Sequence, residues 1–146
     1  MSSIALYLLL TLRPFETDLC TSWPEGTSRD RYKWAHCCVV HDLHYWAGGS
    51  KDDRLGADKD LRSCVTKAHS KAMGDLMFLG VRAGRLSPIK FKAKGWGFAW
   101  PKTRTRYQAL NIEEIDLVRD ELYDNHPHVE LETVDVFIQQ LKDRRN

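Results

Sequence analysis

The chain has 146 residues, of which 42% are hydrophobic and 29% are charged, and its formal net charge is +2. This size and composition suit one globular domain with a modest core. The sequence contains no internal repeat, no low-complexity tract and no glycine-rich phosphate loop, so repeat architectures and phosphate-loop nucleotide binding are excluded. No run of residues predicts a β-strand of more than a few residues, and we expect a mainly α fold.

The N-terminal segment 1–16 contains a short apolar run, in which residues 4–10 read IALYLLL. This run is shorter than the about 20 apolar residues that a membrane-spanning helix needs. It resembles the apolar part of a secretory signal, although no basic residue precedes it. The sequence leaves open whether the segment is a signal remnant, an anchor or an element packed on the domain. We expect residues 17–146 to form that domain.

Two consecutive helices are predicted after a loop at 13–28. The first spans about 29–46 and ends at two glycines, which supply the left-handed backbone of a helix terminus. Ser50 and Asp53 then form a capping-box pattern that begins a second helix at about 51–81. One face of this second helix is expected to be buried and to carry a single carboxylate. Its residues are Leu55, Asp58, Leu61, Val65, Ala68, Ala72, Leu76 and Leu79.

Two further amphipathic helices are predicted near the C-terminus. The first begins at an Asn111 cap with Glu114 at its third position, and the second spans about 131–142. Their periodicity predicts two buried apolar faces. These faces are formed by Ile115, Val118 and Leu122, and by Val134, Phe137, Ile138 and Leu141.

The turn between the first two helices sets the register of their side chains. Helices joined by so short a turn lie antiparallel, so residues equally far from the turn stand level. The pair Cys37 and Cys64 and the pair His41 and Asp58 are both centred on this turn. We therefore predict a Cys37–Cys64 disulfide and a hydrogen bond between His41 and Asp58.

The remaining two cysteines, Cys38 and Cys20, are then left to pair with each other, which would tie the preceding loop to the first helix. Reduced thiols or a zinc site are the alternatives for four cysteines. Zinc is disfavoured because the usual Cys-x2-Cys spacing is absent and His36, His41 and His44 have no evident further ligands. A disulfide-bonded chain is expected to be secreted or periplasmic.

The first helix also carries a group of chemically active side chains. Cys37, His41 and Tyr45 follow one another at one-turn intervals on a single face. A histidine held by a buried carboxylate such as Asp58 is a general base. The adjacent Asp42 can bind a hard cation such as calcium. A base and a calcium ion together suit ester hydrolysis by water, with no serine or cysteine nucleophile.

The pattern Cys-Cys-x-x-His-Asp-x-x-Tyr resembles the active-site helix of the secreted phospholipase A2 superfamily, over about residues 17–66. Asp58 stands six residues before Cys64, as the second aspartate of that family does. The resemblance implies calcium-dependent hydrolysis of the sn-2 ester of glycerophospholipids. It also implies that His41 is the base, that Asp58 orients it, that Tyr45 supports Asp58, and that Asp42 binds calcium. The family's disulfide pairing matches the pairing predicted from the hairpin.

The sequence departs from the animal enzymes in two places. They have a cysteine where this chain has His44, and residues 20–26 do not copy their glycine-rich calcium loop. The segment is closer to the bacterial and fungal members, which use an aspartate before the loop cysteine. That similarity implies that Asp18 gives a side-chain oxygen and Leu19 a carbonyl oxygen to calcium. A turn or cap role is nearly as good an interpretation of Asp18.

Residues 82–106 form a basic and aromatic segment with eight Lys or Arg residues and no acidic residue. Such a segment suggests an anionic partner. A solvated loop is the default interpretation. We expect a phospholipid membrane surface, with Trp96, Phe98 and Trp100 at headgroup depth. No known nucleic-acid-binding motif appears.

A rival interpretation assigns no catalysis to the chain. In it, the chain is a non-catalytic phospholipase A2-like module that binds lipid or a protein partner through residues 82–106. The departure of residues 20–26 from the calcium loop favours this alternative.

Overall fold

The computed structural model describes residues 12–20, 23–83 and 95–145, and within these ranges the chain forms five α-helices and no β-strand. The mainly helical class predicted from the sequence is therefore confirmed. The apolar run at 4–10 and residues 84–94 of the basic segment lie outside the described residues. The helices are α2 (Ala35–Ala47), α3 (Lys51–Ala68), α4 (Lys71–Ala83), α5 (Ile112–Asn125) and α6 (Leu131–Asp143).

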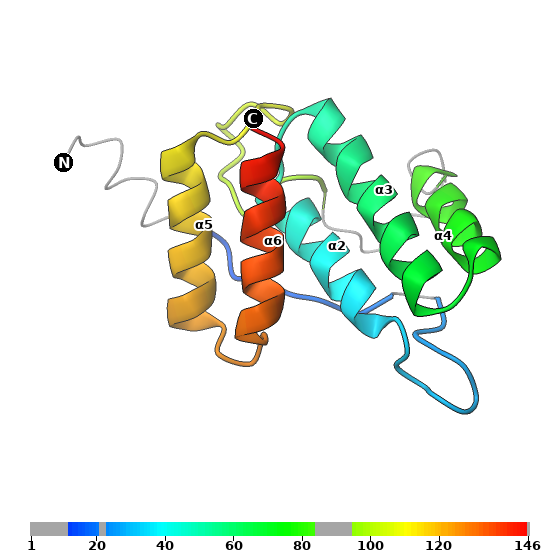
Figure 1. Cartoon of the computed structure of the whole chain (residues 1–146). Coiled ribbons are helices and arrows are strands. Elements are labelled where there is room, and N and C mark those ends of the chain that lie inside the picture. The colour runs from blue at the N-terminus through cyan, green and yellow to red at the C-terminus, as the bar shows by residue number, and fades with distance from the viewer. Residues whose placement is uncertain (1–11, 21–22, 84–94, 146) are drawn as a thin grey trace.

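Helix α2 is the central element of the arrangement (Figure 1). It contacts α3 on one side and α6 on the other, while α4 packs on α3 and α5 packs on α6. One apolar cluster joins α2 to α5 and α6, and a second one joins α2 to α3 and α4. None of the described helices has both the length and the apolar character that crossing a bilayer requires.

The α2–α3 turn forms as predicted from its glycines and its capping box. Gly48 and Gly49 have φ angles of 75° and 137°, in the region that L side chains rarely adopt. The Ser50 hydroxyl accepts from the Asp53 backbone N–H, and the Asp53 carboxylate accepts from the Ser50 N–H. A Cβ on Gly48 would lie 2.7 Å from the Cα of Gly97, so a larger residue would push the chain apart here.

The start of the first helix was predicted too early. The helix begins at Ala35, and not at about residue 29. The reason is Trp34, whose indole N–H donates to the Pro24 carbonyl at 2.7 Å and whose backbone N–H donates to the Glu25 carbonyl at 2.9 Å. These bonds bind the buried Trp34 to the preceding loop, so the residues before it form turns.

The predicted second helix is two helices that fold back on each other. His69 and Ser70 interrupt it, and the Ser70 hydroxyl accepts from the Met73 N–H in the first turn of α4. Gly74 allows α4 to approach α3 closely, because a Cβ there would lie 2.6 Å from the Arg62 carbonyl oxygen. The predicted buried face is therefore correct at Asp58, Leu61 and Val65 but wrong at its end. Ala72, Leu76 and Leu79 are exposed.

The C-terminal helices agree with their prediction. Asn111 and Glu114 form the capping box of α5. All seven residues of the two predicted apolar faces are buried. They are Ile115, Val118 and Leu122 on α5, and Val134, Phe137, Ile138 and Leu141 on α6.

Two tryptophans that were expected on the surface lie in the interior. The indole N–H of Trp96 donates to the Gly49 carbonyl at 2.9 Å, and that of Trp100 donates to the Ala47 carbonyl at 2.6 Å. Both rings are buried, and Phe98 is partly buried against the core. Buried indoles that bond to the end of α2 serve packing, so Trp96 and Trp100 are not membrane-contacting residues in this fold.

Both predicted disulfides are present. Cys20–Cys38 ties the loop before α2 to that helix, and Cys37–Cys64 joins α2 to α3. All four cysteines are bonded. The Cys37–Cys64 bond follows from the antiparallel register set by the short turn, and Cys20–Cys38 joins the two remaining cysteines.

His44 on α2 forms hydrogen bonds with residues at the end of α6. Its Nε2 lies 2.7 Å from the Gln140 Oε1, and its Nδ1 lies 3.2 Å from a guanidinium nitrogen of Arg144, which also pairs with Asp60. Arginine can only donate, so Nδ1 accepts and the ring is neutral. Burial, followed by the Arg144 charge, lowers the pKa of His44 to about 3.

This burial predicts that His44→Gln destabilises the protein most at high pH. The pKa of His44 in the folded protein lies below its ordinary value of 6.5. Below pH 6.5, His44 therefore binds a proton in the unfolded chain but stays neutral in the folded one. Through His44, the free energy of unfolding of the native protein therefore falls by up to about 1.4 kcal/mol per pH unit below pH 6.5. The variant has no histidine at this position, so its stability does not fall for this reason. Urea unfolding at pH 7.5 and pH 5 should show the gap between native and variant shrinking. His128→Gln, at an exposed site, is the control, and a constant gap would contradict the account.

Candidate functional site

The centre of the candidate site is a contact between His41 on α2 and Asp58 on α3. The His41 Nε2 lies 2.7 Å from the Asp58 Oδ1, as the hairpin register predicted. The Asp58 side chain is fully buried, and 10% of the His41 side chain is exposed. In the neutral ring, Nε2–H donates to the carboxylate, so Nδ1 is the nitrogen that can accept a proton.

Asp58 receives three donors. Besides His41, the Tyr45 hydroxyl donates to Oδ1 at 2.9 Å, and the Arg82 guanidinium donates to Oδ2 at 2.9 Å. Burial is the largest single influence on the pKa of Asp58 and raises it. The bonds from the three donors and the nearby His41 charge together outweigh burial and hold the pKa below its usual value. Asp58 is therefore an ionised carboxylate inside the protein.

Tyr45 is itself held by neighbouring groups. Arg54 Nε donates to the Tyr45 hydroxyl at 3.3 Å, and the same guanidinium donates to the Tyr107 hydroxyl at 2.7 Å. The Tyr45 ring also packs edge-on against Trp96, with centroids 5.0 Å apart. Burial, followed by the charge of Asp58, raises the pKa of Tyr45 to about 12, so its hydroxyl keeps the proton that it donates to Asp58.

The contact between Arg82 and Asp58 was not predicted from the sequence. Arg82 was assigned only to the basic segment 82–106, because residues 51–81 were expected to form one continuous helix. The signal that could have found it is Ser70, a residue that favours helix caps. With a reversal at Ser70, Asp58 and Arg82 stand equally far from the turn, as His41 and Asp58 do from theirs.

Asp42 lies beside the loop that contains the other predicted calcium ligands. The Thr17 hydroxyl donates to the Asp42 Oδ2 at 2.6 Å, and the Leu19 N–H donates to the same Thr17 hydroxyl at 3.1 Å. Burial raises the pKa of Asp42 to about 7. The Thr17 bond and the His41 charge oppose this rise, and the Asp18 charge adds to it. A cation bound beside Asp42 would offset the repulsion that the Asp18 charge exerts on it.

Leu19 has a left-handed backbone, with φ 59°, which is uncommon for a residue other than glycine. Such strained residues recur at binding sites. The predicted ligand set of Asp42, Asp18 and Leu19 would supply only oxygen atoms, as calcium prefers. These residues fit a calcium ion by their chemistry.

A second group of metal-ligand types occurs in the described part of the chain. One nitrogen of His36 and the sulfurs of Cys37 and Cys64 lie within 4.8 Å of one another. The two sulfurs are bonded to each other, so neither is available as a thiolate. The disulfide therefore argues against zinc at this place.

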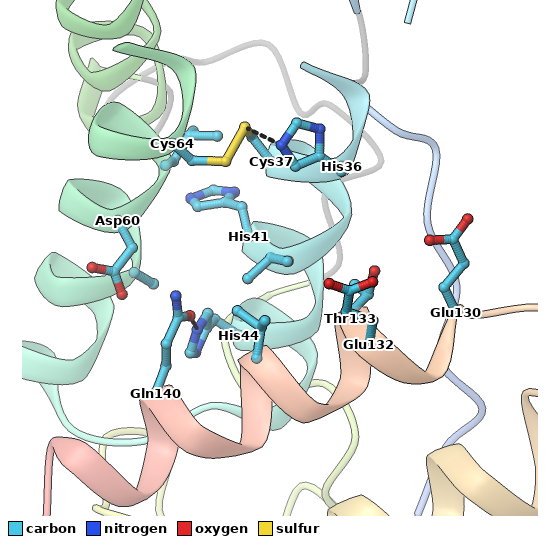
Figure 2. A pocket seen from close by; sticks show the side chains of 14 residues that line it. His36, Cys37, His41, His44, Asp60, Cys64, Glu130, Glu132, Thr133 and Gln140 are labelled. Carbon is cyan, nitrogen blue, oxygen red and sulfur yellow. Dashed lines mark hydrogen bonds between the residues drawn. A yellow bond between two sulfur atoms is a disulfide. The ribbon is translucent and has the colours of Figure 1, made fainter. Parts of the chain in front are cut away.

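A cavity of about 290 Å³ lies between α2, α3 and α6. Figure 2 shows His41 and His44 from α2, Asp60 and Cys64 from α3, and Thr133 and Gln140 from α6 around it. Asp42, Asp58 and Tyr45 do not line it. The cavity and the candidate calcium site are therefore separate features, and His41 is the residue of the candidate dyad that borders the cavity.

Comparison of the chain with known proteins gave no match: no family model, no curated protein and no solved structure is significantly similar to it. The geometry of the site and the chemistry of its residues are therefore the basis for a functional assignment.

The buried Asp58 predicts that loss of Arg82 destabilises the protein. Arg82→Gln should lower the free energy of unfolding by about 2 kcal/mol, because it removes a charge-assisted hydrogen bond from a fully buried carboxylate. Arg82→Lys keeps the charge and should lose less. Urea unfolding at pH 7 measures both variants. Arg119→Gln, which breaks two surface ion pairs, should cost under about 1 kcal/mol. Equal values for the Arg82 and Arg119 variants would exclude a structural role for the Arg82 contact.

Proposed function

We propose that this chain is a calcium-dependent, phospholipase A2-like hydrolase of the sn-2 ester of glycerophospholipids. The observation that carries the proposal is the fully buried Asp58 carboxylate, bonded to both His41 and Tyr45 across a disulfide-clamped helix pair. Burying a charged carboxylate costs free energy of folding, which a functional role would explain. The resemblance of the α2 sequence to the active-site helix of that superfamily supplies the substrate class.

The mechanism follows from the proton positions. Nδ1 of His41 takes a proton from a water molecule, which attacks the ester carbonyl carbon as the proton leaves. The ionised Asp58 stabilises the imidazolium that forms, and Tyr45 and Arg82 hold Asp58 in place. His41 then returns the proton to the departing alkoxide oxygen. Water is the attacking group, so no covalent enzyme intermediate is needed. All four cysteines are in disulfides and do not act as nucleophiles.

Asp42, Asp18 and Leu19 would hold the calcium ion. When bound, calcium polarises the ester carbonyl and stabilises the negative charge that develops on its oxygen. The Thr17 hydroxyl positions both the Asp42 carboxylate and the Leu19 backbone. The two disulfides support a secreted or periplasmic location, in which they persist.

A non-catalytic lipid- or protein-binding module is the second candidate. The Thr17 hydrogen bond favours it, because it satisfies one Asp42 oxygen without a cation. The sequence of residues 20–26, which lacks a glycine-rich calcium loop, points the same way. Calcium binding separates the two candidates.

His41→Ala should lower the rate of fatty-acid release from phospholipid by at least about 100-fold, because it removes the general base. The variant should remain folded at the assay temperature, as circular dichroism would show, although the lost bond to the buried Asp58 lowers its melting temperature. His36→Ala is the matched control, since His36 is an exposed histidine on the same helix. A folded His41→Ala protein that keeps most of its activity would refute the mechanism.

Calcium should raise the melting temperature of the native protein at pH 8, and magnesium should do so far less, since magnesium demands a stricter geometry. Asp42→Asn should abolish the calcium effect. It should also melt higher than the native protein in chelator. The pKa of Asp42 is raised to about 7, so its ionised form costs stability above that pH, and asparagine avoids this cost. No calcium shift in the native protein would favour the binding module.

A further inference from the structure

The outer face of α4 is apolar along its whole length. Its exposed residues after Lys71 are Ala72, Leu76, Leu79, Gly80 and Ala83, which recur at helical spacing. Leu76 is 49% exposed and Leu79 is 62% exposed. Large apolar side chains grouped on one face of a helix indicate a surface that another phase or molecule covers.

The opposite face of α4 accounts for its packing. Gly74 and Met77 are buried against α3, and Met77 belongs to the apolar cluster that includes the disulfide cysteines. The folded chain therefore uses one side of α4 and leaves Leu76 and Leu79 outside. The core does not need them as apolar residues.

The charges around this face are positive. Asp75, the acidic residue of α4, is neutralised by Arg62 and Lys71, each at 2.6 Å. Lys67 is exposed close to the start of the helix, and the Lys71 side chain is 77% exposed. Arg82 lies in the last turn, partly exposed. Arg82 is already paired with Asp58, so the net positive charge lies near the start of the helix. Cations beside an apolar stripe complement an anionic surface.

We propose that the outer face of α4 is the surface by which this protein docks on anionic phospholipid, with Leu76 and Leu79 inserted among the headgroups. An amphipathic helix of this kind lies in the plane of the interface, and nearby Lys and Arg side chains strengthen its binding to anionic lipid. This inference rests on the proposed function, which requires a lipid surface as substrate. It replaces the role that the sequence gave to Trp96 and Trp100, whose rings are buried.

Helix α4 is connected to the candidate site through Arg82. Arg82 reaches from α4 to Asp58, the carboxylate that holds His41. Docking through α4 would therefore bring the lipid surface to the helix that contacts the candidate catalytic pair.

The test compares two paired variants of the full chain. One is Leu76→Ser with Leu79→Ser. The other is Ile112→Ser with Leu131→Ser, at α5 and α6 residues that are 56% and 60% exposed. Binding is measured by co-sedimentation with vesicles of ether-linked phosphatidylglycerol and phosphatidylcholine, which contain no ester to cleave. The α4 variant should bind at least tenfold more weakly than the native protein, and the variant of Ile112 and Leu131 should bind normally. Vesicles of phosphatidylcholine alone should bind the native protein at least tenfold more weakly.

Hydrolysis of a short-chain phospholipid dispersed as monomers keeps this inference separate from the proposed function. Both variants should hydrolyse the monomers at the native rate, since neither touches His41 or Asp58. If the native protein cleaves monomers but binds no vesicle, the docking surface is refuted and the proposed function stands. If it binds vesicles through α4 but cleaves nothing, the enzyme proposal fails and the lipid surface stands. Equal loss of binding in both variants would overturn the α4 surface. So would a native dimer in sedimentation velocity that the α4 variant abolishes.

Discussion

The structure depends on an ionised carboxylate held entirely inside the protein. Asp58 has no exposed side-chain surface and is kept negative by His41, Tyr45 and Arg82, which come from two other helices. An unpaired charge in such a place would cost several kcal/mol. The three contacts therefore constrain how α2, α3 and α4 pack. The same constraint gives His41 a fixed tautomer, which is the condition for its proposed role as a base.

A tight turn, two disulfides and a set of hydrogen bonds hold the helices in this arrangement. The tight turn at Gly48 and Gly49 places α2 and α3 antiparallel, and the Cys37–Cys64 disulfide fixes their relative height one turn away from His41. Cys20–Cys38 holds the loop that contains Asp18 and Leu19 next to the following turn of α2, where Asp42 lies. On the other side, α6 is joined to α2 through His44 and Arg144. The candidate site thus lies where independent restraints meet.

The sequence predicted the contacts that a single turn determines. Cys37–Cys64 and His41–Asp58 both follow from equal distances to one strong turn signal, and the capping boxes at Ser50 and Asn111 are local patterns. Contacts that depend on several elements were missed. Arg82 requires the reversal at Ser70, a weaker signal than two glycines. The burial of Trp96 and Trp100 depends on free carbonyls at the end of α2, which periodicity does not reveal. The roles of Asp42, Asp18 and Leu19 stay predictions.

The most direct test of the account is which acyl chain the protein releases. A phospholipid with different labelled fatty acids at sn-1 and sn-2 would be incubated with the native protein in H₂¹⁸O, with calcium or with chelator. The account predicts release of the sn-2 fatty acid alone, only with calcium, and with one ¹⁸O atom incorporated in its carboxylate, since water is the attacking group. Release of the sn-1 chain, or release that persists in chelator, would contradict the proposed chemistry. No release from any phospholipid would leave the lipid- or protein-binding module as the function of this fold.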